Sequence, residues 1–79
     1  MSKLVISVQP LDGYILELFL NNGVIKNFDM KPYLQYPVFK SLQDINIFKS
    51  VQVDELGGIE WNLDNGASLS QDTLLAKMY

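Results

Sequence analysis

The sequence predicts a small α+β fold: an antiparallel sheet from two hairpin groups, with short middle helices and a C-terminal helix. Three observations predict this fold class. Apolar and polar residues alternate near the N-terminus, glycine-containing turns follow the alternating segments, and the C-terminal residues show helical spacing. The 79 residues, of which 48% are hydrophobic and 19% charged, fit a single domain over residues 1–79.

The first hairpin is predicted from two alternating segments. Residues 3–9 form the first expected strand, with Leu4, Ile6 and Val8 on one side. The turn "PLDG" at residues 10–13 contains a proline that fixes φ, an aspartate that can bond its own backbone and a glycine that accepts a positive φ. Residues 14–20 form the second strand, which places four apolar side chains on one face: Tyr14, Leu16, Leu18 and Leu20.

The pair Asn22-Gly23 is the strongest turn signal, because these residues favour a two-residue type I′ hairpin. That register places Leu20 opposite Ile25, and it places Phe28 opposite Glu17 on the other face. Either the sheet is covered on both faces, or a bulge between Ile25 and Phe28 turns the phenylalanine inward. We favour the bulge.

The middle segment, residues 30–50, is predicted to form short helices or 3₁₀ turns. Pro32 and Pro37 suit first helical positions, and Asp44 suits the N-cap of a following turn. The large apolar residues of this segment recur at helical spacing, so the turns would lay them over the sheet. These residues are Phe39, Leu42, Ile47 and Phe48.

The second hairpin group begins where alternation resumes at residues 51–53, and residues 59–61 form its second strand. A two-residue Gly57-Gly58 loop would oppose two like charges, Glu55 and Glu60. A three-residue loop instead opposes Val53 to Ile59 and Val51 to Trp61, and it places Gly57 where a positive φ is needed. We therefore predict the three-residue loop, residues 55–57.

The last part of the chain is predicted to form a strand, a turn and a capped helix. Trp61, the only tryptophan, lies on an alternating strand and is expected in the core. Asn65-Gly66 marks the next turn. Ser70 suits the N-cap of a final helix, and Asp72 in its first turn suits the helix dipole. The apolar stripe of this helix consists of Leu74, Leu75 and Met78.

The residues available for chemistry exclude several kinds of catalytic and metal site. The chain has no histidine and no cysteine, so Ser-His and Cys-His nucleophiles and the common zinc and copper sites are excluded. Asp54 and Glu55 are adjacent, and neighbouring strand residues point to opposite faces, so they are poor partners for acid–base work. The segment "WNLDNG" lacks the spacing of an EF-hand calcium loop. We predict no catalytic, cofactor-binding or metal site, no cofactor, and no enzyme activity.

Charge and hydropathy also bear on partners and location. The net charge is −3, there is no arginine and the six lysines are scattered, so direct nucleic-acid binding is not expected. No apolar run approaches the roughly 20 residues that a membrane span needs. The apolar stretch at the N-terminus is too short for a signal peptide. We expect a cytoplasmic protein that binds another protein or a second copy of itself, and no membrane.

The order of motifs resembles the bacterial domain of unknown function 2442 family. The resemblance rests on "LNNGVIKNFD", "FKSLQDINIF" and "VQVDELGGIEWNLDNGASLSQDTLLAKMY", which cover nearly the whole chain. The chain departs from the family pattern at four places. Two extra residues separate Trp61 from Asn65-Gly66, and the proline that commonly follows the tryptophan is absent. Ser68 stands where aspartate is common, and Gln71 stands where a proline would open the last helix. The residues that we take as structural signature are Asn22, Gly23, Phe28, Asp29, Phe39, Leu42, Phe48, Gly57, Trp61, Asn65, Gly66, Leu69, Asp72 and Leu74.

The resemblance implies no established enzyme activity. Small stand-alone members are often encoded beside another small protein, which implies an antitoxin-like or partner-binding role. The net charge of −3 and the absence of arginine would make this chain the acidic half of such a pair, with a more basic partner. The alternative is a small-ligand-sensing or regulatory domain, because related domains precede helix-turn-helix segments in longer proteins. An enclosed apolar pocket would favour the sensor, whereas a flat apolar patch or an open sheet edge would favour the protein partner.

Overall fold

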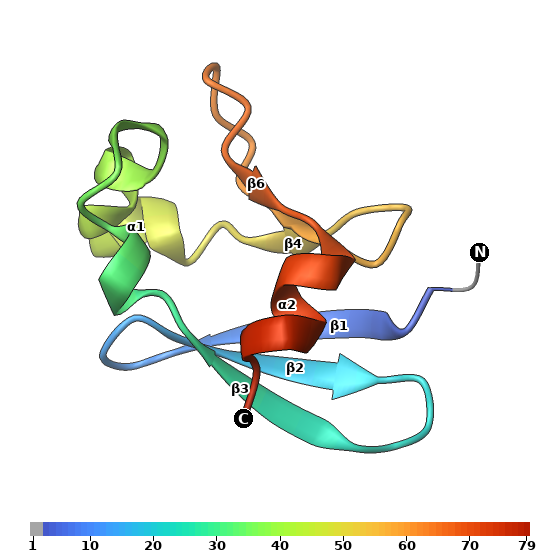
Figure 1. The fold of residues 1–79 in the computed structure, drawn as a ribbon. Coiled ribbons are helices and arrows are strands. Elements are labelled where there is room, and N and C mark those ends of the chain that lie inside the picture. The colour runs from blue at the N-terminus through green and yellow to red at the C-terminus, as the bar shows by residue number, and fades with distance from the viewer. Residues whose placement is uncertain (1–2) are drawn as a thin grey trace.

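The structure, a computed structural model, describes residues 3–79. It contains two three-stranded antiparallel sheets, three short helices that connect the first sheet to the second along the chain, and a C-terminal helix (Figure 1). The strand orders are β1-β2-β3 and β4-β5-β6. The α+β fold class and the two hairpin groups are therefore confirmed, with the difference that each group forms a sheet of its own.

The first sheet consists of β1 (Val5–Leu11), β2 (Ile15–Leu20) and β3 (Ile25–Asp29). The register of β1 shifts between Val5 and Ser7, which leaves Ile6 as the extra residue of a bulge. As a result Val5 is fully buried and Ile6 is 51% exposed. The simple alternation that places Leu4, Ile6 and Val8 on one side of the strand is interrupted at Ile6, because the sequence pattern does not reveal the extra residue of the bulge.

The predicted register of the β2–β3 hairpin was also wrong. Its loop has three residues, 21–23, with Gly23 at φ 86°, and Leu16 lies opposite Phe28. Both of these side chains are fully buried, so Phe28 faces inward without the bulge expected between Ile25 and Phe28. The extra loop residue shifts the pairing by one position and thereby brings the aromatic ring to the core face.

Three short helices follow β3: η1 (Lys31–Tyr33), η2 (Pro37–Gln43) and α1 (Ile45–Phe48). A proline lies in the first turn of both η1 and η2, where its missing N–H is not needed. The Asp44 side chain accepts a hydrogen bond from the Asn46 N–H at 2.9 Å and caps α1, as predicted. The helices bury Phe39, Leu42 and Phe48.

The second sheet consists of β4 (Gln52–Val53), β5 (Ile59–Glu60) and β6 (Ser68–Leu69). The three-residue loop 55–57 is confirmed, with Val53 opposite Ile59 and Gly57 at φ 86°. The expected pairing of Val51 with Trp61 is absent, because the ladder between the two strands ends at Gln52 and Glu60. The Trp61 N–H donates to the Ala67 carbonyl on the other side. The sequence did not predict β6.

The chain ends in helix α2 (Gln71–Lys77). The Ser70 hydroxyl accepts a hydrogen bond from the Thr73 N–H at 3.3 Å, so the predicted N-cap is confirmed. Leu74 is fully buried, while Leu75 and Met78 are half-buried at the margin. Beyond the helix, the Tyr79 N–H and carbonyl bond the Asn27 carbonyl and N–H at 2.8 and 2.7 Å, which attaches this residue to the outer edge of β3.

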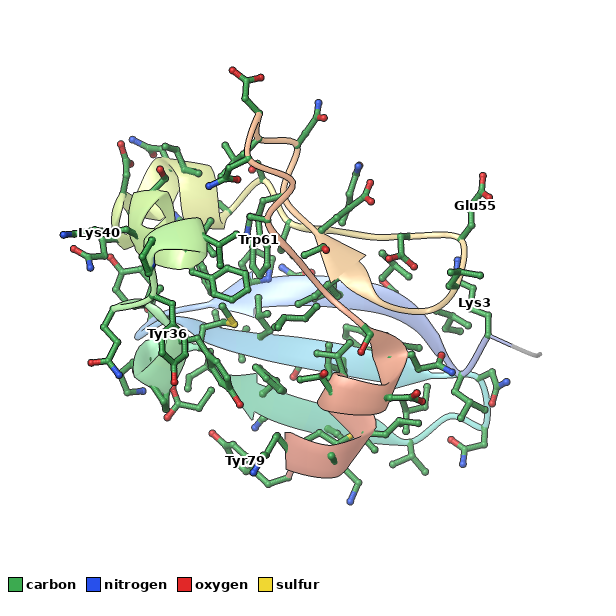
Figure 2. The ribbon with its side chains drawn as sticks, turned by 45° about the horizontal axis from the view of Figure 1, so that its top comes forward. Lys3, Tyr36, Lys40, Glu55, Trp61 and Tyr79 are labelled. Carbon is green, nitrogen blue, oxygen red and sulfur yellow. The ribbon has the colours of Figure 1, made fainter. Side chains whose placement is uncertain are left out.

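A single apolar cluster joins the two sheets and the helices. Trp61 is 2% exposed and lies in the middle of the molecule (Figure 2), so the prediction that it is a core residue is confirmed. Its ring centroid lies 6.1 Å from that of Phe39 and 6.4 Å from that of Phe48. Its indole N–H donates to the Phe48 carbonyl at 3.0 Å, which satisfies the one polar atom of this buried side chain.

Candidate functional site

The signature residues build the core and the turns and do not converge on a common site. Seven of them are buried core side chains: Phe28, Phe39, Leu42, Phe48, Trp61, Leu69 and Leu74. Gly23, Gly57 and Gly66 adopt positive φ in turns, and the side chains of Asn22 and Asn65 each accept a backbone hydrogen bond from a residue two positions later. The Asp29 carboxylate accepts from the Lys31 N–H at the start of η1. Asp72 is exposed in the first turn of α2.

A residue outside this set, Gln71, ties the N-terminus of α2 to the start of the first sheet. Its side-chain oxygen Oε1 accepts hydrogen bonds from the backbone N–H groups of Leu4 at 2.8 Å and Val5 at 3.3 Å. Gly57 packs so closely on this amide that a Cβ on the glycine would lie 1.9 Å from Oε1. Gln71 is only 8% exposed, so its polar group belongs to the framework of the fold.

A shallow hollow beside the β4–β5 loop gathers three carboxylates. It is lined by Gln52, Val53, Asp54, Glu55, Leu56 and Glu60. The Asp54 Oδ1 atom accepts from the N–H groups of Leu56 and Gly58, and the Glu60 Oε2 atom accepts from the Gln52 amide at 2.8 Å. Two of the acids are thus engaged in local structure. No group of three or more His, Cys, Asp or Glu within residues 3–79 is placed to hold a metal ion.

The outward face of the first sheet is the most distinctive surface of the molecule. Figure 1 shows the middle helices and the second sheet on the same side of this sheet, and Leu16, Leu18 and Phe28 point to that covered side. The side chains in between point the other way. They form three cross-strand rows, which together we call the open face: Ser7–Phe19–Ile25, Gln9–Glu17–Asn27 and Leu11–Ile15–Asp29.

Two of the three rows of the open face each carry two large apolar side chains: Phe19 and Ile25 in one, Leu11 and Ile15 in the other. Ile25 is 54% exposed and Leu11 is 37% exposed, while Ile15 and Phe19 are half-buried between their neighbours on adjacent strands. The bulge residue Ile6 adds a further exposed aliphatic side chain next to Ser7. Apolar side chains that gather on one exposed face, as opposed to being scattered singly, are typical of an interaction surface.

The edges of the first sheet are less accessible than its face. In an antiparallel pair every second residue directs its backbone N–H and carbonyl away from the neighbouring strand. On β3 the backbone groups of Asn27 point outward in this way, and Tyr79 occupies them (Figure 2 shows Tyr79 at the periphery). On β1, Gln71 takes the first outward N–H groups, and Pro10 supplies no N–H. Both edges are therefore partly blocked against the addition of another strand.

Sequence reasoning missed the residues of the open face, although a signal for them exists. The second strand reads "ILELFL", in which Ile15 and Phe19 alternate with Leu16 and Leu18. A strand that is apolar on both faces is either covered on both faces or has an exposed apolar face. The structure covers one face only, so Ile15 and Phe19 remain at the surface.

Comparisons with known proteins agree with the resemblance inferred from the motifs. The family model described as "Protein of unknown function (DUF2442)" matches residues 5–78 of the 79-residue chain. Neither the curated proteins nor the solved structures contain a match. Within residues 3–79, no helix has both the length and the apolar character needed to cross a membrane.

Proposed function

The chain belongs to the family described as "Protein of unknown function (DUF2442)", and we propose that it is a non-enzymatic protein-binding module, antitoxin-like in its pairing with one neighbouring small protein. The observation that carries this proposal is the uncovered apolar face of β1–β2–β3. Burial of such a face against a partner removes apolar surface from water, which is the main source of affinity in protein association.

The composition of the open face supports a protein partner. Phe19 lies on the central strand between Ser7 and Ile25, and an aromatic side chain with aliphatic neighbours is the usual anchor of an interface. The net charge of −3 would speed encounter with a basic partner. We place this pairing in the cytoplasm, in keeping with the absence of cysteines.

A small-ligand sensor is the second candidate function, and it has weaker support. A sensor needs an enclosed apolar pocket with a few polar groups. The hollow beside the β4–β5 loop is open to solvent and carries Asp54, Glu55 and Glu60. Such a surface offers a small apolar ligand little burial.

Co-expression with the protein encoded by the adjacent gene tests the proposed function. The wild-type chain should co-purify with that protein, and the complex should weaken at high salt because the encounter is electrostatic. The variants Phe19→Ser and Ile25→Ser should lose the complex, since they remove the apolar anchors of the open face. Ile25 is more than half exposed, so its substitution leaves the fold intact.

The matched control is Leu56→Ser. Leu56 is 81% exposed at the tip of the β4–β5 loop, so this variant removes an exposed apolar side chain of similar size at a site remote from the open face. It should co-purify as the wild type does. The proposal fails if no complex forms at either salt concentration and the neighbouring protein is no less toxic in the presence of this chain than in its absence.

A further inference from the structure

We propose that the open face recognises a partner whose contacting surface is apolar around one central lysine or arginine, which pairs with Glu17. This inference rests on the proposed function and specifies the chemistry of the partner. It assigns to Glu17 the role of a specificity-determining residue, which decides which apolar surfaces can dock on the face.

The position of Glu17 carries the inference. It lies on β2, the central strand, in the middle row of the open face, with Gln9 on one side and Asn27 on the other. Along the strand, Ile15 and Phe19 flank it on the same face. A partner that covers the two apolar rows must therefore also cover this carboxylate.

No cation of the described chain neutralises Glu17. The ion pair found among residues 3–79 joins Lys31 to Asp29 at 3.1 Å and does not involve Glu17. Lys26 lies on the neighbouring strand opposite Leu18, so its side chain belongs to the covered side of the sheet. None of the nine residues in the three rows is a lysine. The carboxylate is therefore available to a partner.

Burial of an unpaired carboxylate is strongly unfavourable, because the ion loses its hydration and gains nothing in return. An apolar partner without a cation would meet this penalty at the centre of the interface. A partner with a lysine or arginine at that point replaces the lost hydration of the carboxylate with an ion pair and hydrogen bonds. If that cation is absent, the affinity falls sharply, because the buried carboxylate is left unpaired. Glu17 thus favours basic partners and rejects neutral ones.

The same argument disfavours a second copy of this chain as the occupant. Two copies that dock face to face about a two-fold axis present the same residues to each other. Because Glu17 is central in the face, the two carboxylates would come close together and repel.

A copy of this chain with reversed charge at Glu17 serves as the probe, because it presents an apolar face around a central cation. Wild type and the variant Glu17→Lys, mixed in equal amounts at high micromolar concentration, should form a one-to-one complex in sedimentation velocity. Each protein alone should remain monomeric. The complex should dissociate as salt is raised, and Phe19→Ser in the wild-type partner should weaken it at least tenfold.

The matched control is a mixture of wild type with Glu55→Lys, which changes the net charge by the same amount on the exposed β4–β5 loop (Figure 2). This mixture should not associate. If wild type alone dimerises as strongly as the mixture with Glu17→Lys, the face binds protein but Glu17 does not select the partner, and the inference is overturned while the proposed function stands. If neither mixture associates, the ion-pair recognition is wrong. The co-purification experiment then decides the proposed function by itself.

Discussion

At the scale of single residues, Trp61 shows how far the type of side chain predicts the position of a residue in the fold. Its position on an alternating strand predicts a core residue, and the structure buries it between Phe39 and Phe48. Its N–H finds the Phe48 carbonyl, which the sequence could not indicate because that bond depends on where α1 packs. The side chain type predicts burial, whereas the partner of a buried polar atom is a tertiary property.

Replacement of Trp61 should therefore cost much of the stability of this protein. Trp61→Ala should lower the free energy of unfolding by about 3–5 kcal/mol, because it opens a large cavity in the single core cluster. The measurement is urea denaturation followed by circular dichroism. Trp61→Phe, which keeps an aromatic ring but loses the hydrogen bond, should cost clearly less. A Trp61→Ala variant that unfolds at the same urea concentration as wild type would contradict the burial of this ring.

Gln71 is the residue whose importance the sequence concealed. Gln71 stands where the family pattern commonly has proline. That departure alone does not indicate whether the residue stabilises or destabilises the fold. The structure shows that its amide oxygen binds two backbone N–H groups of the first strand, more than sixty residues earlier in the chain. Proline could not make these bonds, so the substitution adds a tie between α2 and the first sheet.

At the scale of elements, the sequence predicts where turns lie better than it predicts their register. Asn22-Gly23 fits both a two-residue loop and a three-residue loop that ends in glycine, and the local residues do not distinguish them. Burial distinguishes them, because only the three-residue loop places Phe28 opposite Leu16 on the core face. The same parity argument, applied to Val53 and Ile59 in the second hairpin, gave the correct loop from sequence alone. The strand β6 contributes one large apolar side chain, Leu69, and therefore leaves no alternating pattern in the sequence.

The glycines of the loops offer a matched test of tertiary packing. Gly13 and Gly57 both have positive φ, but a Cβ on Gly13 would meet nothing within 4 Å, whereas one on Gly57 would collide with the Gln71 amide. Gly13→Ala should cost about 1–2 kcal/mol from backbone strain alone. Gly57→Ala should cost about 1–3 kcal/mol more, because the Gln71 side chain must leave its two hydrogen bonds.

A double-mutant cycle separates this contact from backbone strain. Gly57→Ala combined with Gln71→Ala should cost less than the sum of the two single changes, since the collision disappears when the amide is removed. Thermal unfolding of the four proteins measures the coupling. Equal costs for Gly13→Ala and Gly57→Ala, together with an additive cycle, would show that Gly57 is not in contact with Gln71.

At the scale of the whole molecule, the open face results from where the rest of the chain packs. The apolar pattern of β2 on both faces is visible in the sequence, but which face remains uncovered depends on where the middle helices and the second sheet pack (Figure 1). That arrangement is a sum of long-range contacts, with no local signal. The candidate site was therefore harder to predict than the core, even though its residues are adjacent to core residues on the same strands.

If the open face serves binding, its side chains should contribute little to folding. The double variant Leu11→Ser/Ile25→Ser removes two exposed apolar side chains and should change the free energy of unfolding by about 1 kcal/mol or less. Leu18→Ala, one strand position away from Phe19 but fully buried, should cost about 2–5 kcal/mol. Urea denaturation of the three proteins measures both effects. The opposite ranking would mean that the face is an unrecognised part of the core. The expected ranking means that stability does not account for these apolar side chains, and it leaves the affinity for a partner as the property that they serve.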